Sequence, residues 1–367
     1  MNVSPFKAAY PRAELITSPS SFFSTIKHQY IEYRDNGIFR ENTDIGYYVL
    51  RIKSELGTHV GILTMTDIKE MGRYNVLKHE KTLASKEQNM MHLLLQRKAL
   101  VKPVLLGYKP NATLAGVMKK YMKKKPLLKI DFEEDREVHT IWAISDPIQV
   151  ESISKAFAKV KKAYIGDGHH RSTTIQLLSR TKQLGKEAKK YNNLYTAYFP
   201  FDQLRICDYN RMVDISEIMS LPEFIIALSK YFEMEKIEGP VKPHKKHMLT
   251  TYMDGHWYAL TWKKKFLKKN KNTPVLLDSA LVNRYIFEDI LSIKDVRTDT
   301  RISYYGGTQP LTKIVNSAKK KRLGIGICIP PVTIKELTAI ADKKQTLPPK
   351  STWFLPRLKS GILTIDL

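Results

Sequence analysis

The spacing of apolar and polar residues over the first two hundred positions changes between the periods of strands and helices. The first 45 residues are rich in Pro, Ser, Tyr and Asn, and we expect irregular or edge structure there. Beyond them, apolar runs bounded by turn residues predict strands, and apolar positions three and four apart predict helices. The expected elements are strands over 47–53, 58–65, 103–108 and 139–144, a helix over 85–100, a helix that starts at Asp146-Pro147, and a helix over 172–180.

The pattern changes after about residue 205. Strands and helices alternate before that point, which is typical of a mixed α/β domain. We therefore expect an α+β protein with a mixed α/β domain over residues 1–205 and a second α+β domain over 206–367. In the second domain the pattern predicts helices over 225–232, 278–290 and 332–341, a hairpin over 248–261 that turns at Asp254-Gly255, a basic segment over 263–271 and a strand over 324–329.

Composition places the chain among folded proteins without a membrane span. It has 367 residues, of which 43% are hydrophobic and 26% charged, and a chain of this length favours two domains. We find no stretch near the roughly 20 apolar residues that a spanning helix needs. The two cysteines, Cys207 and Cys328, lie far apart and suggest no disulfide framework. The expected location is the cytoplasm.

The formal net charge of +25 raises the question of nucleic acid as a partner. It comes from 61 Lys and Arg against 36 Asp and Glu, and much of the excess is lysine in short clusters. Such clusters attract polyanions without sequence preference at low salt. The sequence shows no helix-turn-helix pattern, which weighs against DNA binding but leaves it open.

The most specific polar motif is the turn from Asp167 to Arg171, which follows an apolar strand and precedes the helix expected from residue 172. Glycines at positions 166 and 168 bracket the acid, and His169, His170 and Arg171 follow directly. Backbone N–H groups at the start of a helix, together with a guanidinium, form a site that attracts phosphate.

Two further segments carry polar residues that packing does not explain. His79-Glu80 precedes the helix expected over 85–100, and Glu80 is a candidate general base. Near the C-terminus, Pro348-Pro349 stiffens a stretch in which Lys350, Ser351 and Thr352 each have donors for phosphate oxygens.

These three motifs in this order resemble the SerK-like family, which comprises free serine kinases with a ParB/sulfiredoxin-type fold and a large bacterial group that shares their motifs. The bacterial group is also similar at Gly61-Ile62-Leu63, at Asp208 to Arg211, and at Phe354 to Leu358. The resemblance covers roughly residues 45–367. It implies a ParB/sulfiredoxin-like N-terminal domain and phosphoryl transfer from ATP or ADP, with Mg²⁺, to a small hydroxyl compound such as free L-serine.

The resemblance also implies roles for single residues. Glu80, Asp167 and His170 would be catalytic, with Asp167 near the metal or the substrate. Nucleotide phosphates would be held by Gly168, His169, His170, Arg171, Lys350, Ser351 and Thr352. Secondary candidates are His79, Asn210 and Arg211.

Other interpretations stay open at this point. Where many bacterial relatives continue the turn with Tyr-Glu-Thr, this chain has Ser172-Thr173-Thr174, so the acceptor is not defined. The main alternative is a ParB-like nucleotide-binding protein that acts as a switch or binds DNA without phosphorylating metabolites. A sulfiredoxin-type repair enzyme needs a reactive cysteine, and neither cysteine lies in a catalytic motif. A metal hydrolase that uses Asp167, His169 and His170 needs a second ligand pair, and the sequence shows none with a known spacing.

Overall fold

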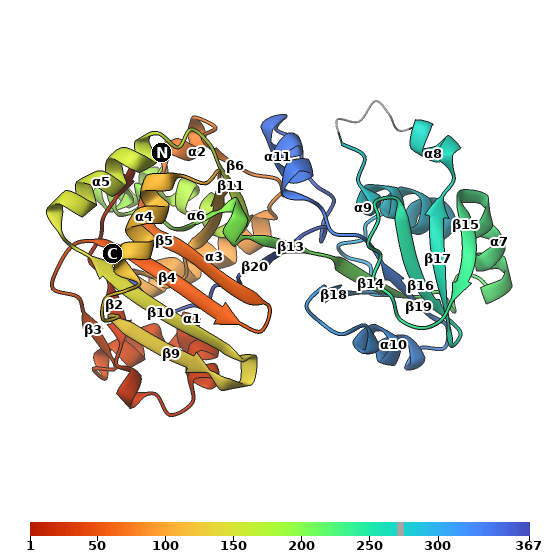
Figure 1. The fold of residues 1–367 in the computed structure, drawn as a ribbon, viewed down its shortest axis with the longest axis horizontal. Helices are drawn as coiled ribbons and strands as arrows, with labels where there is room; N and C mark the ends of the chain where they lie inside the picture. The colour runs from red at the N-terminus through yellow and green to blue at the C-terminus, as the bar shows by residue number, and fades with distance from the viewer. Residues whose placement is uncertain (270–274) are drawn as a thin grey trace. The chain divides into compact units, whose positions relative to one another are not determined.

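The chain folds into two compact units, each described here by itself (Figure 1). A computed structural model describes residues 1–269 and 275–367. Unit 1 comprises Met1–Arg205 and Leu355–Leu367, and unit 2 comprises Ile206–Phe354. The sequence division assigned 355–367 to the second domain, whereas the structure returns them to unit 1. The reason is a strand pairing between β21 (Ile365–Asp366) and β7 (Ala99–Leu100), which the sequence spacing does not reveal.

Unit 1 is built on a mixed sheet in which the interior strand β8 is buried along its whole length. A strand buried on both faces requires cover on both sides of the sheet. In sheet order the strands are β6 (Val76–Leu77), β11 (Ala163–Asp167), β8 (Val104–Tyr108), β12 (Asn193–Pro200), β5 (Gly57–Asp67), β4 (Tyr47–Ser54), β10 (Glu137–Ile144) and β9 (Leu128–Phe132), with β1 (Val3–Ser4) paired to β5. A separate ladder joins β2 (Ala9–Pro11) and β3 (Phe39–Glu41).

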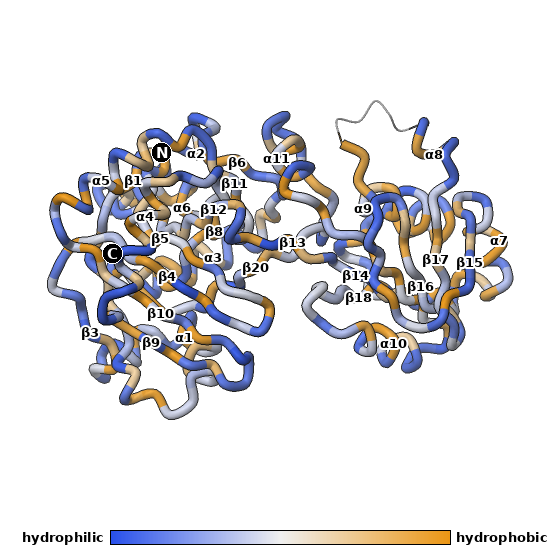
Figure 2. The backbone as a smooth tube through the Cα atoms, in the orientation of Figure 1, coloured by the Kyte–Doolittle hydropathy of each residue, from blue (hydrophilic) through white to orange (hydrophobic). Residues whose placement is uncertain are grey.

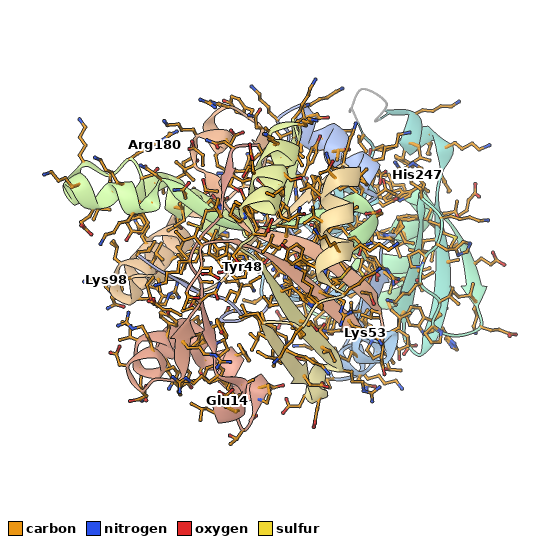
Figure 3. All side chains as sticks on the ribbon, turned by 60° about the vertical axis from the view of Figure 1, so that its left-hand side comes forward. Glu14, Tyr48, Lys53, Lys98, Arg180 and His247 are labelled. Atoms are coloured by element: carbon orange, nitrogen blue, oxygen red, sulfur yellow. The ribbon has the colours of Figure 1, made fainter. Side chains whose placement is uncertain are left out.

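Helices supply the cover for this sheet. The α-helices are α1 (Pro19–Asp35), α2 (Lys69–Gly72), α3 (Ala84–Arg97), α4 (Ala112–Tyr121), α5 (Pro147–Ala158) and α6 (His169–Leu178), and the short 3-10 segments are η1 (Ala13–Leu15), η2 (Glu133–Asp135), η3 (Lys182–Tyr191) and η4 (Phe201–Gln203). Along β4, Tyr48 lies inside the unit while Lys53 reaches the surface (Figure 3).

Unit 2 contains a second sheet with apolar clusters on both faces. Met212 and Val213 are neighbours in β14, and they pack into different clusters because successive strand residues point to opposite faces. The sheet order is β15 (Phe232–Ile237), β17 (His256–Trp262), β16 (Met248–Met253), β19 (Gly324–Cys328), β14 (Tyr209–Asp214) and β18 (Ile302–Gly306). The helices are α7 (Leu221–Tyr231), α8 (Lys264–Lys269), α9 (Asp278–Leu281), the π-helical η5 (Val282–Ile290), α10 (Leu311–Lys319) and α11 (Ile334–Asp342); β13 (Arg205–Cys207) pairs with β20 (Trp353–Leu355).

The α+β class is confirmed, and most expected elements are present within a few residues of their predicted bounds. The side chain of Asp146 accepts from the amide of Gln149 at 2.9 Å and so caps α5, as its sequence predicts. Of the basic segment expected over 263–271, residues 264–269 form α8, and 270–271 lie outside the described residues. Hydrophobic stretches run through the strands, and hydrophilic ones through many loops and helix ends (Figure 2).

One expectation for the N-terminus is wrong. Residues 19–35 form the 17-residue helix α1 where irregular structure was expected. Its serines, threonine and aromatic residues are weak helix formers, so propensity does not reveal it. Phe23, Ile26 and Tyr30 provide the buried face that stabilises it. Among the described residues, no helix combines the length and apolar character needed to cross a membrane.

Candidate functional site

Strand directions in unit 1 bring three chain segments to one edge of the sheet. β6 and β11 run parallel, so their carboxyl ends lie at the same edge. β8 runs antiparallel to β11, and Asp167 at the end of β11 pairs with Leu105 near the start of β8. His79-Glu80, the Asp167–Arg171 turn and Lys102 are therefore neighbours, although 90 residues separate His79 from His169 in the sequence.

The turn after β11 leaves the first amides of α6 without intrahelical partners. Gly168 is the residue before the helix, with φ of 103°, a left-handed conformation that glycine adopts without strain. The first intrahelical bond runs from the amide of Ser172 to the carbonyl of Gly168, at 2.9 Å. The amides of residues 169–171 precede this bond and, with the helix dipole, favour an anion at this end.

Asp167 lies in a cluster of cations. Its Oδ2 accepts from Nη2 of Arg171 at 2.8 Å, and its Oδ1 lies 3.7 Å from Nη1 of Arg357. Burial alone would raise the pKa of Asp167, but the charges of Arg171, Lys102 and Arg357 outweigh it and hold this pKa well below its usual range. Asp167 is therefore a carboxylate at all physiological pH values.

The cluster keeps an excess of positive charge. Lys102, Arg171 and Arg357 carry three positive charges against the one negative charge of Asp167, which leaves a net charge of +2. Burial, followed by the neighbouring Arg171, lowers the pKa of Lys102 to about 8, because Asp167 compensates only part of both effects. A second anion would relieve this excess, so the cluster and the start of α6 favour the same kind of ligand.

Glu80 lies beside the imidazole of His169. The Nδ1 of His169 is 3.6 Å from Oε2 of Glu80, and its Nε2 accepts from the amide of His79 at 3.5 Å. Because Nε2 is an acceptor, the proton of the neutral ring is assigned to Nδ1, facing Glu80. Burial, and then His79, lowers the pKa of His169 well below its usual value, so the ring stays neutral.

His79 packs against His169 in this arrangement. Its ring contacts the ring of His169 edge-on, with 4.4 Å between the centroids. Burial lowers the pKa of His79 to about 3, so it stays neutral. His79 is thus a packing partner of His169, and Glu80, with a side chain 44% exposed, is the accessible carboxylate of the group.

His170 and Lys78 are the chain neighbours of His169 and His79 in this group. His170 is partly exposed on α6, and burial followed by the charge of Lys86 on α3 lowers its pKa. The Nζ of Lys78 donates to Oγ1 of Thr173 at 2.7 Å and ties the loop after β6 to α6.

The geometry does not fit Asp167 as a Mg²⁺ ligand. Mg²⁺ favours carboxylates and phosphates in octahedral geometry, but both oxygens of Asp167 face guanidinium groups. Within residues 1–269 and 275–367 no group of three or more His, Cys, Asp or Glu side chains is arranged to hold a metal. Asp167 instead orients Arg171 and Arg357.

The secondary candidates Asn210 and Arg211 are buried in β14 of unit 2. Asn210 donates to Oδ2 of Asp208 at 2.5 Å and accepts from the amide of Ile329 at 3.1 Å, which ties β14 to the residue that follows β19. The guanidinium of Arg211 is fully buried near the ring of Tyr304, 5.8 Å from its centroid. Burial lowers its pKa to about 10. Both residues contribute to the interior of unit 2.

The C-terminal motif also lies in unit 2, on the segment before β20. The Oγ of Ser351 donates to the carbonyl of Pro348 at 2.7 Å and lies 2.9 Å from Oγ of Ser279, so this hydroxyl is used locally. Lys350 has a φ of 55°, and its Nζ lies 5.6 Å from the centroid of the Tyr209 ring. Thr352 is half-buried.

Lys102 and Arg357 were not among the predicted site residues. Lys102 interrupts the apolar run from Ala99 to Leu106, and this lone charge in a buried stretch is a signal that sequence reasoning missed. Arg357 belongs to the segment 354–358, but nothing in its local pattern places it beside Asp167. Only the return of the chain to unit 1 does so.

The chain belongs to the family described as "Protein of unknown function (DUF1015)", which matches residues 6–280. This match confirms the prediction that the chain belongs to an uncharacterised family. The sequence matches no curated protein.

Solved structures similar to the chain include a free serine kinase variant in complex with ADP, at 12% identity and a TM-score of 0.39, which covers 82% of this chain and 92% of that one. A conserved hypothetical protein from Pyrococcus furiosus has 12% identity, a TM-score of 0.39, and coverage of 83% and 94%. SbnI with a C-terminal truncation from Staphylococcus aureus has 11% identity, a TM-score of 0.41, and coverage of 82% and 87%. These values are too low to transfer a residue role.

Proposed function

We propose that this protein is a nucleotide-dependent phosphotransferase that binds phosphate at the start of α6 and transfers a phosphoryl group to a hydroxyl compound. The observation that carries the proposal is the cation excess around Asp167, at a helix start whose first three amides lack intrahelical partners. Phosphoryl transfer relies mainly on positioning and on neutralising phosphate charge, and this cluster supplies both.

Glu80 is the proposed base. The hydroxyl oxygen of the acceptor attacks the terminal phosphorus of the nucleotide, and its proton passes to the carboxylate of Glu80. A new P–O bond to the acceptor forms while the bond to the leaving phosphate of the nucleotide breaks. The neutral imidazole of His169 presents Nδ1–H to Glu80 and holds the carboxylate without neutralising it.

Phosphate recognition is assigned to the amides of residues 169–171 and to the guanidinium groups of Arg171 and Arg357, which Asp167 orients. Roles for His170 in catalysis, and for Lys350 and Thr352 in nucleotide binding, remain predictions. Ser351 is the weakest of these candidates because its hydroxyl is already used within unit 2.

The decisive experiment combines nucleotide binding with product detection. Purified protein is titrated with ADP and ATP by calorimetry, and is incubated with each nucleotide, divalent cations and a panel of hydroxyl compounds while ³¹P NMR follows new phosphomonoesters. We expect nucleotide binding and a transfer product that Glu80→Gln abolishes, with nucleotide affinity unchanged within about twofold.

Other outcomes separate the alternatives. Binding without transfer to any acceptor would favour a nucleotide-dependent switch over a kinase. Absence of nucleotide binding would overturn the phosphate-site assignment itself. Transfer at the wild-type rate in Glu80→Gln would leave the kinase proposal standing and overturn the role of Glu80.

A further inference from the structure

A cavity of about 140 Å³ lies next to the proposed phosphate site, within unit 1. Its apolar wall comes from α3, α6 and the sheet beneath them. Six of the side chains in this wall are Met90, Leu93, Leu94, Val104, Ile175 and Leu194. An engineered apolar cavity of about 150 Å³ is large enough to bind benzene, so this cavity has room for a six-membered ring or a branched chain of similar size.

The lining of the cavity also contains polar side chains, and some of their atoms have no hydrogen-bond partner among the described residues. Arg171 and Lys102 both contribute to its lining, so the cavity and the phosphate site share two side chains. Thr174, also in the lining, is 1% exposed, and its Oγ1 has no hydrogen-bond partner among the described residues. The buried Nε of Arg171 likewise lacks one within the described chain. A buried polar atom without a partner is costly, and a ligand oxygen would relieve that cost.

We infer that this cavity binds the phosphoryl acceptor, and that the acceptor is an anionic hydroxyl compound with an apolar ring or branched chain. The inference rests on the proposed function for its link to phosphoryl transfer. The apolar body occupies the wall formed by Leu93, Leu94 and Ile175, and the acidic group pairs with Lys102. Thr174 bonds an oxygen of the ligand, and the reacting hydroxyl lies toward Arg171.

Free serine fits this cavity poorly. It has no apolar body to fill the wall, and its ammonium group would face the like charges of Lys102 and Arg171. A nucleobase would need several hydrogen-bond partners for its ring nitrogens, whereas in the lining only Thr174 and Arg171 have a buried polar atom without a partner among the described residues. An acidic compound with an apolar body matches both parts of the lining.

The test uses two probes that differ only by a ring: 3-phenyllactate and lactate share the same hydroxy acid head. Affinities are measured by calorimetry for the wild type, for Leu93→Trp, which fills the cavity, and for Leu95→Trp as control. Leu95 is exposed on the same helix and is not part of the lining. Met90→Trp is a second filling variant if Leu93→Trp does not fold. ADP affinity is measured on each variant.

We expect the wild type and Leu95→Trp to bind phenyllactate at least about tenfold more tightly than lactate, and Leu93→Trp to lose this preference while it keeps its ADP affinity. Equal affinity for the two probes in the wild type would overturn the inference. Loss of ADP affinity on filling, with phenyllactate binding unchanged, would assign the cavity to the nucleobase and overturn it as well. If phenyllactate binds in the expected pattern but no nucleotide binds, the ligand class inferred for the cavity would be supported, and only the proposed function would be overturned.

Discussion

The Nδ1 of His169 lies 3.6 Å from Oε2 of Glu80, while Nε2 of the same ring accepts from the amide of His79. These two contacts place the proton of the buried, neutral ring on Nδ1, which faces the accessible carboxylate of Glu80. In the proposed mechanism, His169 is a positioning residue and Glu80 is the base.

We expect His169→Phe to lower the rate of phosphoryl transfer by about tenfold or more, because phenylalanine keeps the ring shape but has no donor for Glu80. His169→Asn retains an N–H near the position of Nδ1, and is expected to recover most of the rate. The measurement is kcat against pH for both variants. His169→Phe should change the pH profile of kcat, whereas His169→Asn should leave it close to that of the wild type. Identical profiles for wild type and His169→Phe would contradict this role.

Arg357 should matter for nucleotide affinity although it lies far from the other motifs in the sequence. Removing one cation from the cluster around Asp167 lowers its attraction for phosphate, so Arg357→Ala is expected to weaken ADP binding by about tenfold. It should also reduce the salt dependence of binding. Arg136→Ala is the matched control, because Arg136 pairs with Glu55 on the exposed surface of unit 1. Equal ADP affinity in the two variants would remove Arg357 from the site.

The pKa of Lys102, lowered to about 8, predicts a pH dependence. A neutral Lys102 reduces the positive charge around the phosphate site, so ADP affinity should be highest below pH 8 and fall by up to about tenfold as the pH rises through this value. Lys102→Arg keeps its charge and should show nearly constant affinity from pH 7 to about 9.5. A parallel decline of ADP affinity with pH in the wild type and in Lys102→Arg would show that Lys102 does not cause the pH dependence.

The same pKa has a consequence for stability. The folded-state pKa is below the unfolded value of about 10.4, so the unfolded chain binds more protons between these values. The charged amine therefore opposes folding at neutral pH, and this opposition fades as the pH rises from about 8 to 10. Lys102→Met should be more stable than the wild type at pH 7, by at most about 3 kcal/mol. In chemical denaturation this advantage should shrink toward pH 10, and an advantage that grows with pH would contradict the sign.

Local patterns predicted the parts of this molecule that depend on neighbouring residues. Asp146-Pro147 identified the start of α5, and Asp254-Gly255 identified the turn between β16 and β17, because caps and turns require particular side chains. Helix α1 was not predicted, because it is stabilised by the packing of Phe23 and Tyr30 rather than by the helix propensity of its residues.

The candidate site likewise contains residues that the sequence predicted and residues that it did not. The turn from Asp167 to Arg171 was visible because its residues are consecutive. Lys102 reaches the site through antiparallel pairing of β8 with β11, and Arg357 through the return of the last segment to unit 1. Neither long-range pairing has a local signature. The buried hydroxyl of Thr174, which has no hydrogen-bond partner among the described residues, likewise has no sequence signal, because its burial depends on the packing around α6.

Gly168 offers a test of the turn itself. It has a φ of 103°, and a Cβ added there would lie 2.7 Å from Nη2 of Arg171. Gly168→Ala should therefore strain the backbone by about 1–3 kcal/mol and displace the guanidinium from Asp167. The expected result is a lower Tm together with at least tenfold weaker ADP binding. Gly116→Ala is the control, because Gly116 lies inside α4 with open space around it and should gain up to about 1 kcal/mol of stability. Wild-type ADP affinity in a destabilised Gly168→Ala would show that the turn is structurally demanding but does not hold the phosphate.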